Sequence, residues 1–177
     1  MQDSGLVRRV DDLGRLVIPK ELRKTLRIKS GDAIQISKDG DNLLLRKYSP
    51  TQGIMATVQS VADSIFESTG KTCMITDTDR VICSSNKNSG EEKCLLNAYA
   101  MKVMNDRKPV FISKNQGEIP FIYTGENIEQ INSRIIFPYV KDGDCFGLIV
   151  LSGENVSNTE QEKSILTFGA SLLSKCI

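Results

Sequence analysis

The sequence predicts two domains, a small and mostly β module over residues 1–48 and a larger α+β module over residues 54–177. The charge changes between them: residues 1–48 carry 11 Lys and Arg against 7 Asp and Glu, and the rest carry 12 against 15. The pattern of apolar residues also changes between the two modules, from short runs with strand spacing in the first to longer runs with helical spacing in the second. Between the two lies the turn-forming stretch KYSPTQG, from which we predict a linker over residues 49–53.

The first module is expected to contain two strands, a short helix and a hairpin. Residues 5–10, GLVRRV, have a period-two strand pattern that sets Leu6, Arg8 and Val10 against Val7 and Arg9. RLVI resumes a strand at residues 15–18 after the turn DDLG. Pro19 suits the first turn of a helix over residues 20–26. The stretch AIQISKDGDNLLLRKY predicts a hairpin over residues 33–48 with its bend at 38–41. A module with so few elements buries little apolar surface by itself. We therefore expect a homodimer in which two chains share one core.

The second module is expected to form an antiparallel sheet with helices at both ends. Its predicted helices cover residues 54–69, 91–106 and 158–177, the last with Ser157 and Glu160 at capping-box spacing. Its predicted strands lie in residues 71–85, with a bend at 76–79, in 108–113, and in a hairpin over 133–153. Residues 114–133 are polar and predict no regular element.

The helix predicted over residues 54–69 is apolar on more than one face. Ile54, Val58, Val61 and Ile65 form one stripe, but Met55, Ala62 and Phe66 extend it around the helix. We therefore expect part of this helix to pack on another chain.

The composition argues against several classes of protein. No apolar run approaches the ~20 residues of a membrane span, and the first residues lack the order of a secretion signal, so a cytoplasmic protein without a membrane partner is expected. Five cysteines without a C-x-x-C pair and a complete lack of histidine argue against a disulfide framework, a zinc site and histidine-based catalysis. We predict no catalytic residue, no metal site and no identified cofactor.

The segment VRRVDDLGRLVIPKELR, residues 7–23, resembles the AbrB-like swapped-hairpin transition-state regulators of spore-forming bacteria. The resemblance implies that two chains interleave their hairpins into one DNA-binding barrel. It also implies that Arg8, Arg15 and Arg23 contact DNA, with Lys24 where relatives often carry arginine and Arg9 as a helper. Lysine at position 24 keeps the charge but loses the planar fork needed for a bidentate contact.

The second module resembles GAF domains in the order of its expected elements. Combined with the AbrB-like barrel, this implies a transcription regulator of sporulation genes, an activator or a repressor, that assembles into a tetramer through its GAF helices. The expected partner is double-stranded DNA, bound mostly through phosphates with loose sequence preference. A small-molecule ligand of the GAF-like module is left open, with residues 83–90 and 114–133 as candidate flanks of its pocket.

Three other interpretations remain open at this point. The cations of the first module could be solvated side chains paired with Asp11, Asp12 and Glu21. The swapped-hairpin barrel also occurs in antitoxins, which usually carry a short tail rather than a second domain. Some GAF domains are free-methionine sulfoxide reductases that use cysteines, and Cys83 and Cys94 lie near the elements that such a pair would need. We expect the protein not to be an enzyme.

Overall fold

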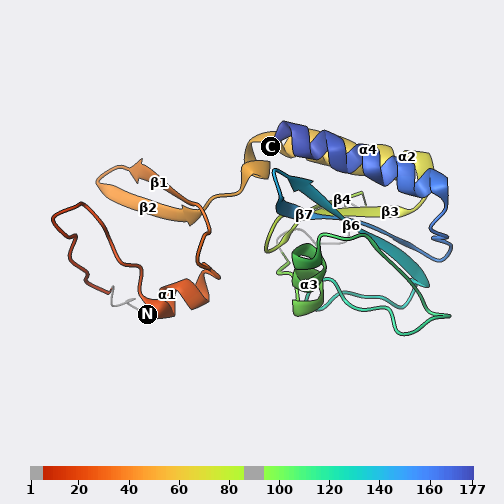
Figure 1. Cartoon of the computed structure of the whole chain (residues 1–177), viewed down its shortest axis with the longest axis horizontal. Helices are drawn as coiled ribbons and strands as arrows, with labels where there is room; N and C mark the ends of the chain where they lie inside the picture. The colour runs from red at the N-terminus through yellow and green to blue at the C-terminus, as the bar shows by residue number, and fades with distance from the viewer. Residues whose placement is uncertain (1–5, 86–93) are drawn as a thin grey trace. The chain divides into compact units, whose positions relative to one another are not determined.

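A computed structural model describes residues 6–85 and 94–177 of the chain (Figure 1). The chain divides into two compact units, residues 1–48 and residues 49–177. Each unit is described by itself.

The first unit contains one short helix and one hairpin. Helix α1, Lys20–Thr25, follows Pro19 and carries Glu21 in its first turn and basic residues in its last, as its dipole favours. Strands β1, Ile34–Asp39, and β2, Asn42–Lys47, pair antiparallel across a bend at Gly40, whose φ is +59°. The predicted helix and the predicted hairpin are confirmed.

The two strands predicted over residues 5–10 and 15–18 do not form in the single chain. Residue 5 lies outside the described residues, and residues 6–18 run without a strand, interrupted by a turn at residues 12–14. A strand needs a neighbour that supplies hydrogen bonds, and β1 and β2 pair only with each other. The strand prediction is therefore wrong for a single chain, because the described part of that chain contains no neighbouring strand with which residues 6–18 could pair.

The first unit has almost no interior. Pro19 is the only buried residue among the described residues 6–48. Large apolar side chains are instead exposed, including Val7 at 89%, Val17 at 76% and Leu13 at 75%. An isolated chain thus leaves the apolar surface of this unit in water.

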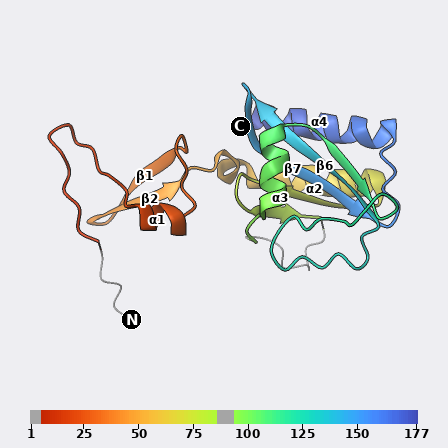
Figure 2. The same ribbon diagram turned by 60° about the horizontal axis from the view of Figure 1, so that its bottom comes forward.

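The second unit has a five-stranded antiparallel sheet in the order β4-β3-β7-β6-β5. Its strands are β3, Thr72–Thr76; β4, Val81–Ser84; β5, Val110–Ser113; β6, Ser133–Lys141; and β7, Asp144–Gly153. A 3-10 helix η1, Pro50–Ile54, leads into α2, Met55–Thr69, while α3, Ala98–Asp106, and α4, Glu160–Cys176, complete the unit. Helices α2 and α4 lie side by side on one face of the sheet and α3 lies on the other (Figures 1 and 2).

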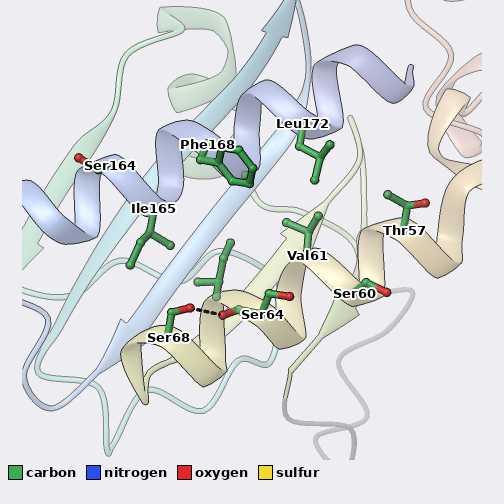
Figure 3. A pocket seen from close by; sticks show the side chains of 11 residues that line it. Thr57, Ser60, Val61, Ser64, Ser68, Ser164, Ile165, Phe168 and Leu172 are labelled. Carbon is green, nitrogen blue, oxygen red and sulfur yellow. Dashed lines mark hydrogen bonds between the residues drawn. The ribbon is translucent and has the colours of Figure 1, made fainter.

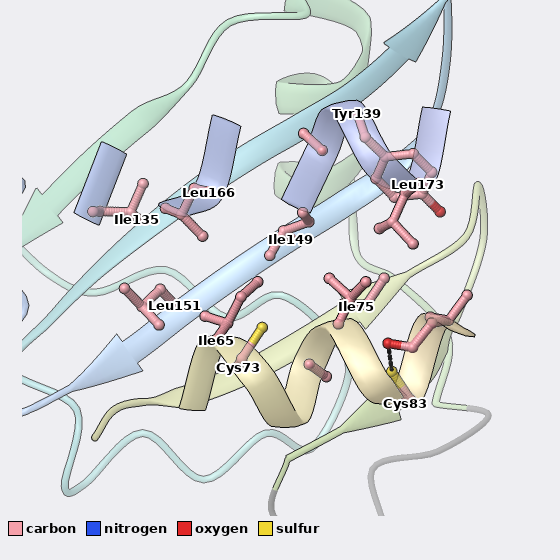
Figure 4. Close-up of a cluster of buried hydrophobic side chains, with 14 of the residues drawn as sticks. Ile65, Cys73, Ile75, Cys83, Ile135, Tyr139, Ile149, Leu151, Leu166 and Leu173 are labelled. Atoms are coloured by element: carbon pink, nitrogen blue, oxygen red, sulfur yellow. Dashed lines mark hydrogen bonds between the residues drawn. The ribbon is translucent and has the colours of Figure 1, made fainter. Parts of the chain in front are cut away.

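Strand β7 shows how the sheet separates two cores. Its residues Ile149 and Leu151 pack with α2 and α4, whereas Leu148 and Val150 pack with α3, as alternation along a strand requires. The first core is drawn in Figure 4. Gly169 of α4 allows the two helices to approach, because an added Cβ would lie 3.2 Å from Ile65 of α2.

Two predicted helix starts are wrong. Helix α3 begins at Ala98 rather than at residue 91, because the side chain of Asn97 accepts a hydrogen bond from the amide of Ala100 at 3.0 Å. Residues 94–96 before it are extended and bridge to neighbouring segments, while 91–93 lie outside the described residues. At α4 the capping box is formed by Thr159 and Glu162 instead of Ser157 and Glu160.

Within the part of the chain that the structure describes, no helix has both the length and the apolar character needed to cross a membrane.

Candidate nucleic-acid interface

All five predicted DNA-binding residues are exposed in the first unit. Arg8, Arg9 and Arg15 lie on the segment before Pro19, and Arg23 and Lys24 lie in the last turn of α1. Among the described residues, no hydrogen bond or ion pair joins the first group to the second. The unit therefore presents all five cations to solvent.

Arg15 is held at a turn that Asp11 organises. One carboxylate oxygen of Asp11 accepts from the backbone amides of Leu13 and Arg15, at 3.1 and 2.8 Å, and the other accepts from Nε of Arg15 at 2.7 Å. The amide and guanidinium of Arg15, in that order of effect, hold the pKa of Asp11 below its ordinary value. Gly14 completes the turn with a φ of +74° and donates to the carbonyl of Asp11.

Among the five candidate cations, the described contacts support the alternative pairing with acidic neighbours for Arg15, and only in part. Arg15 has an ion pair with Asp11, but its side chain is still 70% exposed. An exposed ion pair of this kind contributes only about 0–1 kcal/mol and yields readily to a phosphate. The contact with Asp11 therefore positions the side chain of Arg15 but neutralises little of its charge.

The outer faces of α2 and α4 form an apolar groove of about 460 Å³ (Figure 3). Hydroxyl side chains of α2 line one wall, and Ile165, Phe168 and Leu172 of α4 line the other. Phe168 is 73% exposed at the rim. The hydroxyls of Ser60 and Ser68 donate to carbonyls one turn earlier on α2, so these two donors are satisfied within the helix.

A buried ion pair holds the polar stretch 114–133, and the sequence did not predict it. The guanidinium of Arg134 in β6 donates to Glu126 at 2.7 and 3.3 Å and to the carbonyl of Pro120 at 2.9 Å. Glu126 also accepts from the amide of Ile122 at 2.5 Å. Arg134 is fully buried, and among the described residues its Nε has no hydrogen-bond partner. The only signal in the sequence was an arginine inside the apolar run RIIF.

Two cysteines of the second unit, Cys73 and Cys83, do not have the surroundings of reactive thiols. Cys73 and Cys83 are fully buried in the first core, and the thiol of Cys83 donates to the carbonyl of Val58 at 3.8 Å. Burial, reinforced by Cys83 and Asp63, raises the pKa of Cys73 well above its ordinary value. Cys94 is only half-buried.

The residues described here also include no group of three or more His, Cys, Asp or Glu arranged to hold a metal ion. Residues 86–90, the larger part of the candidate pocket flank 83–90, lie outside the described residues.

The second unit has the fold of GAF domains. Its likeness to the GAF domain of an Acinetobacter phosphoenolpyruvate-protein phosphotransferase has a TM-score of 0.53 at 17% identity, over 72% of this chain and 89% of the other. A type II free methionine-R-sulfoxide reductase from Thermoplasma acidophilum gives a TM-score of 0.55 at 13% identity, over 72% and 94%. At these identities the likeness concerns the fold alone.

Two family models match the chain in succession. Residues 7–53 match the family described as antidote-toxin recognition MazE, bacterial antitoxin. Residues 54–177 match the C-terminal region of stage V sporulation protein T, a transcription factor.

Two curated relatives come from Bacillus subtilis strain 168. The transition state regulatory protein AbrB is 38% identical over 50% of this chain and 92% of its own length. Stage V sporulation protein T is 31% identical over 99% of this chain and 98% of its own length. With a family model across the whole second unit and a relative matched from end to end, the chain belongs to the stage V sporulation protein T family of transcription factors.

Proposed function

We propose that the protein regulates sporulation genes from the bacterial cytoplasm by binding double-stranded DNA through an intertwined dimer of its first unit. The observation that carries this proposal is the exposed apolar surface of residues 6–48, which coexists with five exposed cations on the same segment. The family supports a regulator, and the named relatives are transcription regulators. The protein then acts by binding and has no enzymatic step.

The described residues of the first unit form no hydrophobic core in one chain, and a second copy of the same unit is the partner that would complete one. The sequence predicts strands in residues 6–10 and 15–18, but these residues lack neighbours in one chain, and a second chain supplies strands of the same pattern. Fully burying an apolar side chain of the size of Val or Leu stabilises by about 1.5–3 kcal/mol. Several such side chains, among them Val7, Leu13 and Val17, would be covered in the dimer.

Dimerisation doubles the cations and determines how the DNA is recognised. Arg8, Arg15, Arg23 and Lys24 from two chains engage about eight phosphates, with Arg9 as a helper. Arginine and lysine contacts to phosphates fix the position of the protein but carry no sequence information themselves. Recognition then depends mainly on the shape and deformability of the duplex, which makes the preferred site tolerant of sequence changes.

The groove between α2 and α4 supports a tetramer built from two such dimers. Phe168 and Leu172 project beside a wall of small hydroxyl residues, so two copies related by a two-fold axis insert the ridge of one into the groove of the other. Met55 and Phe66 of α2 are also 37% and 44% exposed, but they do not line this groove. The sequence predicted that part of this helix packs on another chain, without identifying this groove.

Two other functions are less well supported. The match to an antitoxin family covers residues 7–53 only, and residues 49–177 form a compact unit with two cores of their own rather than a short tail. A methionine sulfoxide reductase would require reactive thiols, but Cys83 is fully buried. A small-molecule ligand of the second unit stays a prediction without an identified chemistry.

The test is a titration of a fluorescent duplex with the full-length protein and with a triple variant, Arg8→Gln, Arg15→Gln and Arg23→Gln. We expect the triple variant to lose at least about 100-fold in affinity while it keeps the oligomeric state of the wild type in light scattering. Lys38→Gln, at the exposed bend of β1 and β2, is the matched control and should change affinity less than about threefold. Equal affinity of wild type and triple variant would contradict the proposal.

A further inference from the structure

The segment that enters the second unit is tied to the turn between β3 and β4. The hydroxyl of Ser49 lies 2.8 Å from that of Thr51 and donates to Oδ2 of Asp77 at 3.3 Å. Thr51 is 1% exposed and Asp77 is 6% exposed. These contacts lie in residues 49–51, where the sequence predicted only a linker, and they make the start of this segment part of the second unit.

Asp77 is itself fixed in place by the backbone of the turn. Its Oδ1 accepts from the amides of Asp79 and Arg80, both at 2.9 Å, and its own amide donates to the carbonyl of Arg80 at 2.9 Å. The carboxylate therefore uses one oxygen to build the turn and directs the other at Ser49. Asp77 thus has three hydrogen bonds within the turn besides its contact with Ser49.

The turn is tied in the same way to the far hairpin of the sheet. The hydroxyl of Thr76 donates to the carbonyl of Asp77 at 2.9 Å and accepts from the amide of Leu148 in β7 at 3.0 Å. The carbonyl of Thr76 accepts from the hydroxyl of Tyr139 in β6 at 2.6 Å. Gly147 has no room for a Cβ beside that carbonyl. A continuous set of hydrogen bonds thus runs from β6 and β7 through Thr76 and Asp77 to Ser49.

From this geometry we infer that Ser49, Thr51 and Asp77 form a joint that restrains the linker, so that the two DNA-binding dimers of a tetramer engage one long duplex together. The inference rests on the proposed function, because it needs two DNA-binding dimers in one assembly. A restrained linker confines the second dimer near the DNA once the first has bound, which raises its effective concentration. Releasing the joint leaves both units folded but removes this advantage.

The experiment compares two duplexes and two double variants of the full-length protein. The short duplex accommodates one dimer and the long duplex accommodates two. Ser49→Ala with Thr51→Val removes both hydroxyls of the joint and changes little volume. Ser157→Ala with Thr124→Val removes two exposed hydroxyls elsewhere in the same unit and is the matched control. Hydrogen exchange of the amides in residues 51–54 reports whether the joint has opened.

We expect the joint variant to bind the short duplex within about twofold of wild type and to lose about fivefold or more on the long duplex. Exchange in residues 51–54 should increase in this variant and not in the control. Ser49→Ala alone, which alters a half-buried hydroxyl, should shift both readouts in the same direction.

An unchanged preference for the long duplex, despite faster exchange, would overturn the inference and leave the proposed function intact. Equally, unchanged exchange in the joint variant would show that the three residues do not restrain the segment. Failure of the wild type to bind either duplex would instead overturn the proposed function, and the joint with it. Binding of the wild type to the short duplex therefore distinguishes failure of the inference from failure of the proposed function.

Discussion

The guanidinium of Arg15 and the carboxylate of Asp11 are joined at 2.7 Å across a four-residue turn that the same carboxylate holds through the amide of Arg15. One acidic residue therefore determines both where the backbone of Arg15 lies and where its side chain points. In the proposed DNA complex this turn presents Arg15 to a phosphate.

Arg15→Ala should abolish retention of a duplex in a gel shift, because the contact is repeated in the dimer and both copies are lost. Light scattering should show the same oligomeric state as the wild type, since the side chain is mostly exposed and contributes nothing to a core. Unchanged retention would remove Arg15 from the interface. Arg15→Lys should retain DNA more weakly than wild type, because lysine keeps the charge without the fork.

Asp11→Asn and Asp11→Ala should have opposite effects on affinity at low salt. Asparagine keeps an oxygen that accepts from the amides of Leu13 and Arg15, and it removes a negative charge near the DNA, so binding should tighten by a few fold. Alanine removes the turn as well, so binding should weaken. Filter binding at about 50 mM salt measures both, and an equal change in the two variants would mean that the turn does not position Arg15.

Arg23→Gln should reduce the salt dependence of binding. Each phosphate contact contributes about −0.9 to the slope of log affinity against log salt, and a dimer loses two contacts, so the slope should become less steep by about 1.8. Titrations at four salt concentrations give this slope. A parallel displacement of the line without a change in slope would mean that Arg23 does not contact a phosphate.

Phe168→Asp should convert the proposed tetramer into dimers, because a charge placed in the groove between α2 and α4 cannot be desolvated there. Phe121→Asp is the control, because Phe121 is 48% exposed outside the groove. Light scattering at a fixed protein concentration distinguishes the two states. A tetramer that persists in Phe168→Asp would place the interface on another face.

Glu162 makes the second unit sensitive to acid. Burial raises the pKa of its carboxyl, but hydrogen bonds from Lys71 and from the amide of Thr159, with the charge of Lys71, outweigh burial and lower the pKa below its ordinary 4.5. The contribution to stability is therefore complete above pH 4.5 and is lost as the pH falls through the native pKa. The free energy of unfolding should be about 2 kcal/mol lower in Glu162→Gln at pH 7, with the difference shrinking below pH 4.5.

Urea unfolding followed by circular dichroism measures this difference at each pH. Glu160→Gln is the control, because the side chain of Glu160 is 89% exposed and its pair with Lys163 contributes little. A difference between wild type and Glu162→Gln that stays constant down to pH 3 would contradict the assignment.

Local chemistry explains which elements the sequence predicted. The hairpin of β1 and β2 and the hairpin of β6 and β7 each combine alternation with a glycine at the bend, and Gly40 and Gly143 both have the positive φ that such bends favour. The alternation and the glycine lie within a few residues of each other in the sequence, so each hairpin could be predicted locally. The start of α3 was misplaced because acidic residues at 91 and 92 suggested a first turn, whereas Asn97 supplies the cap.

Non-local contacts explain what could not be predicted. The pairing of Arg134 with Glu126 depends on a polar segment without periodicity folding back over the sheet, and neither residue alone indicates the other. For residues 6–18 the alternation favours strands, but pairing requires a neighbour that one chain lacks. The five candidate cations were chosen by resemblance, and their contacts with DNA stay a prediction.

The near absence of buried side chains in residues 6–48 has a consequence for the amount of protein in the cell. In the proposed dimer, the folding of this unit and its association are one bimolecular reaction, whereas the second unit, with its two cores, folds within a single chain. At low copy number most chains would hold a folded second unit and an incomplete first one. The concentration of DNA-binding dimer would then rise with roughly the square of the concentration of the chain. When synthesis is slow, occupancy of DNA sites would be delayed until the chain reaches the concentration at which it dimerises.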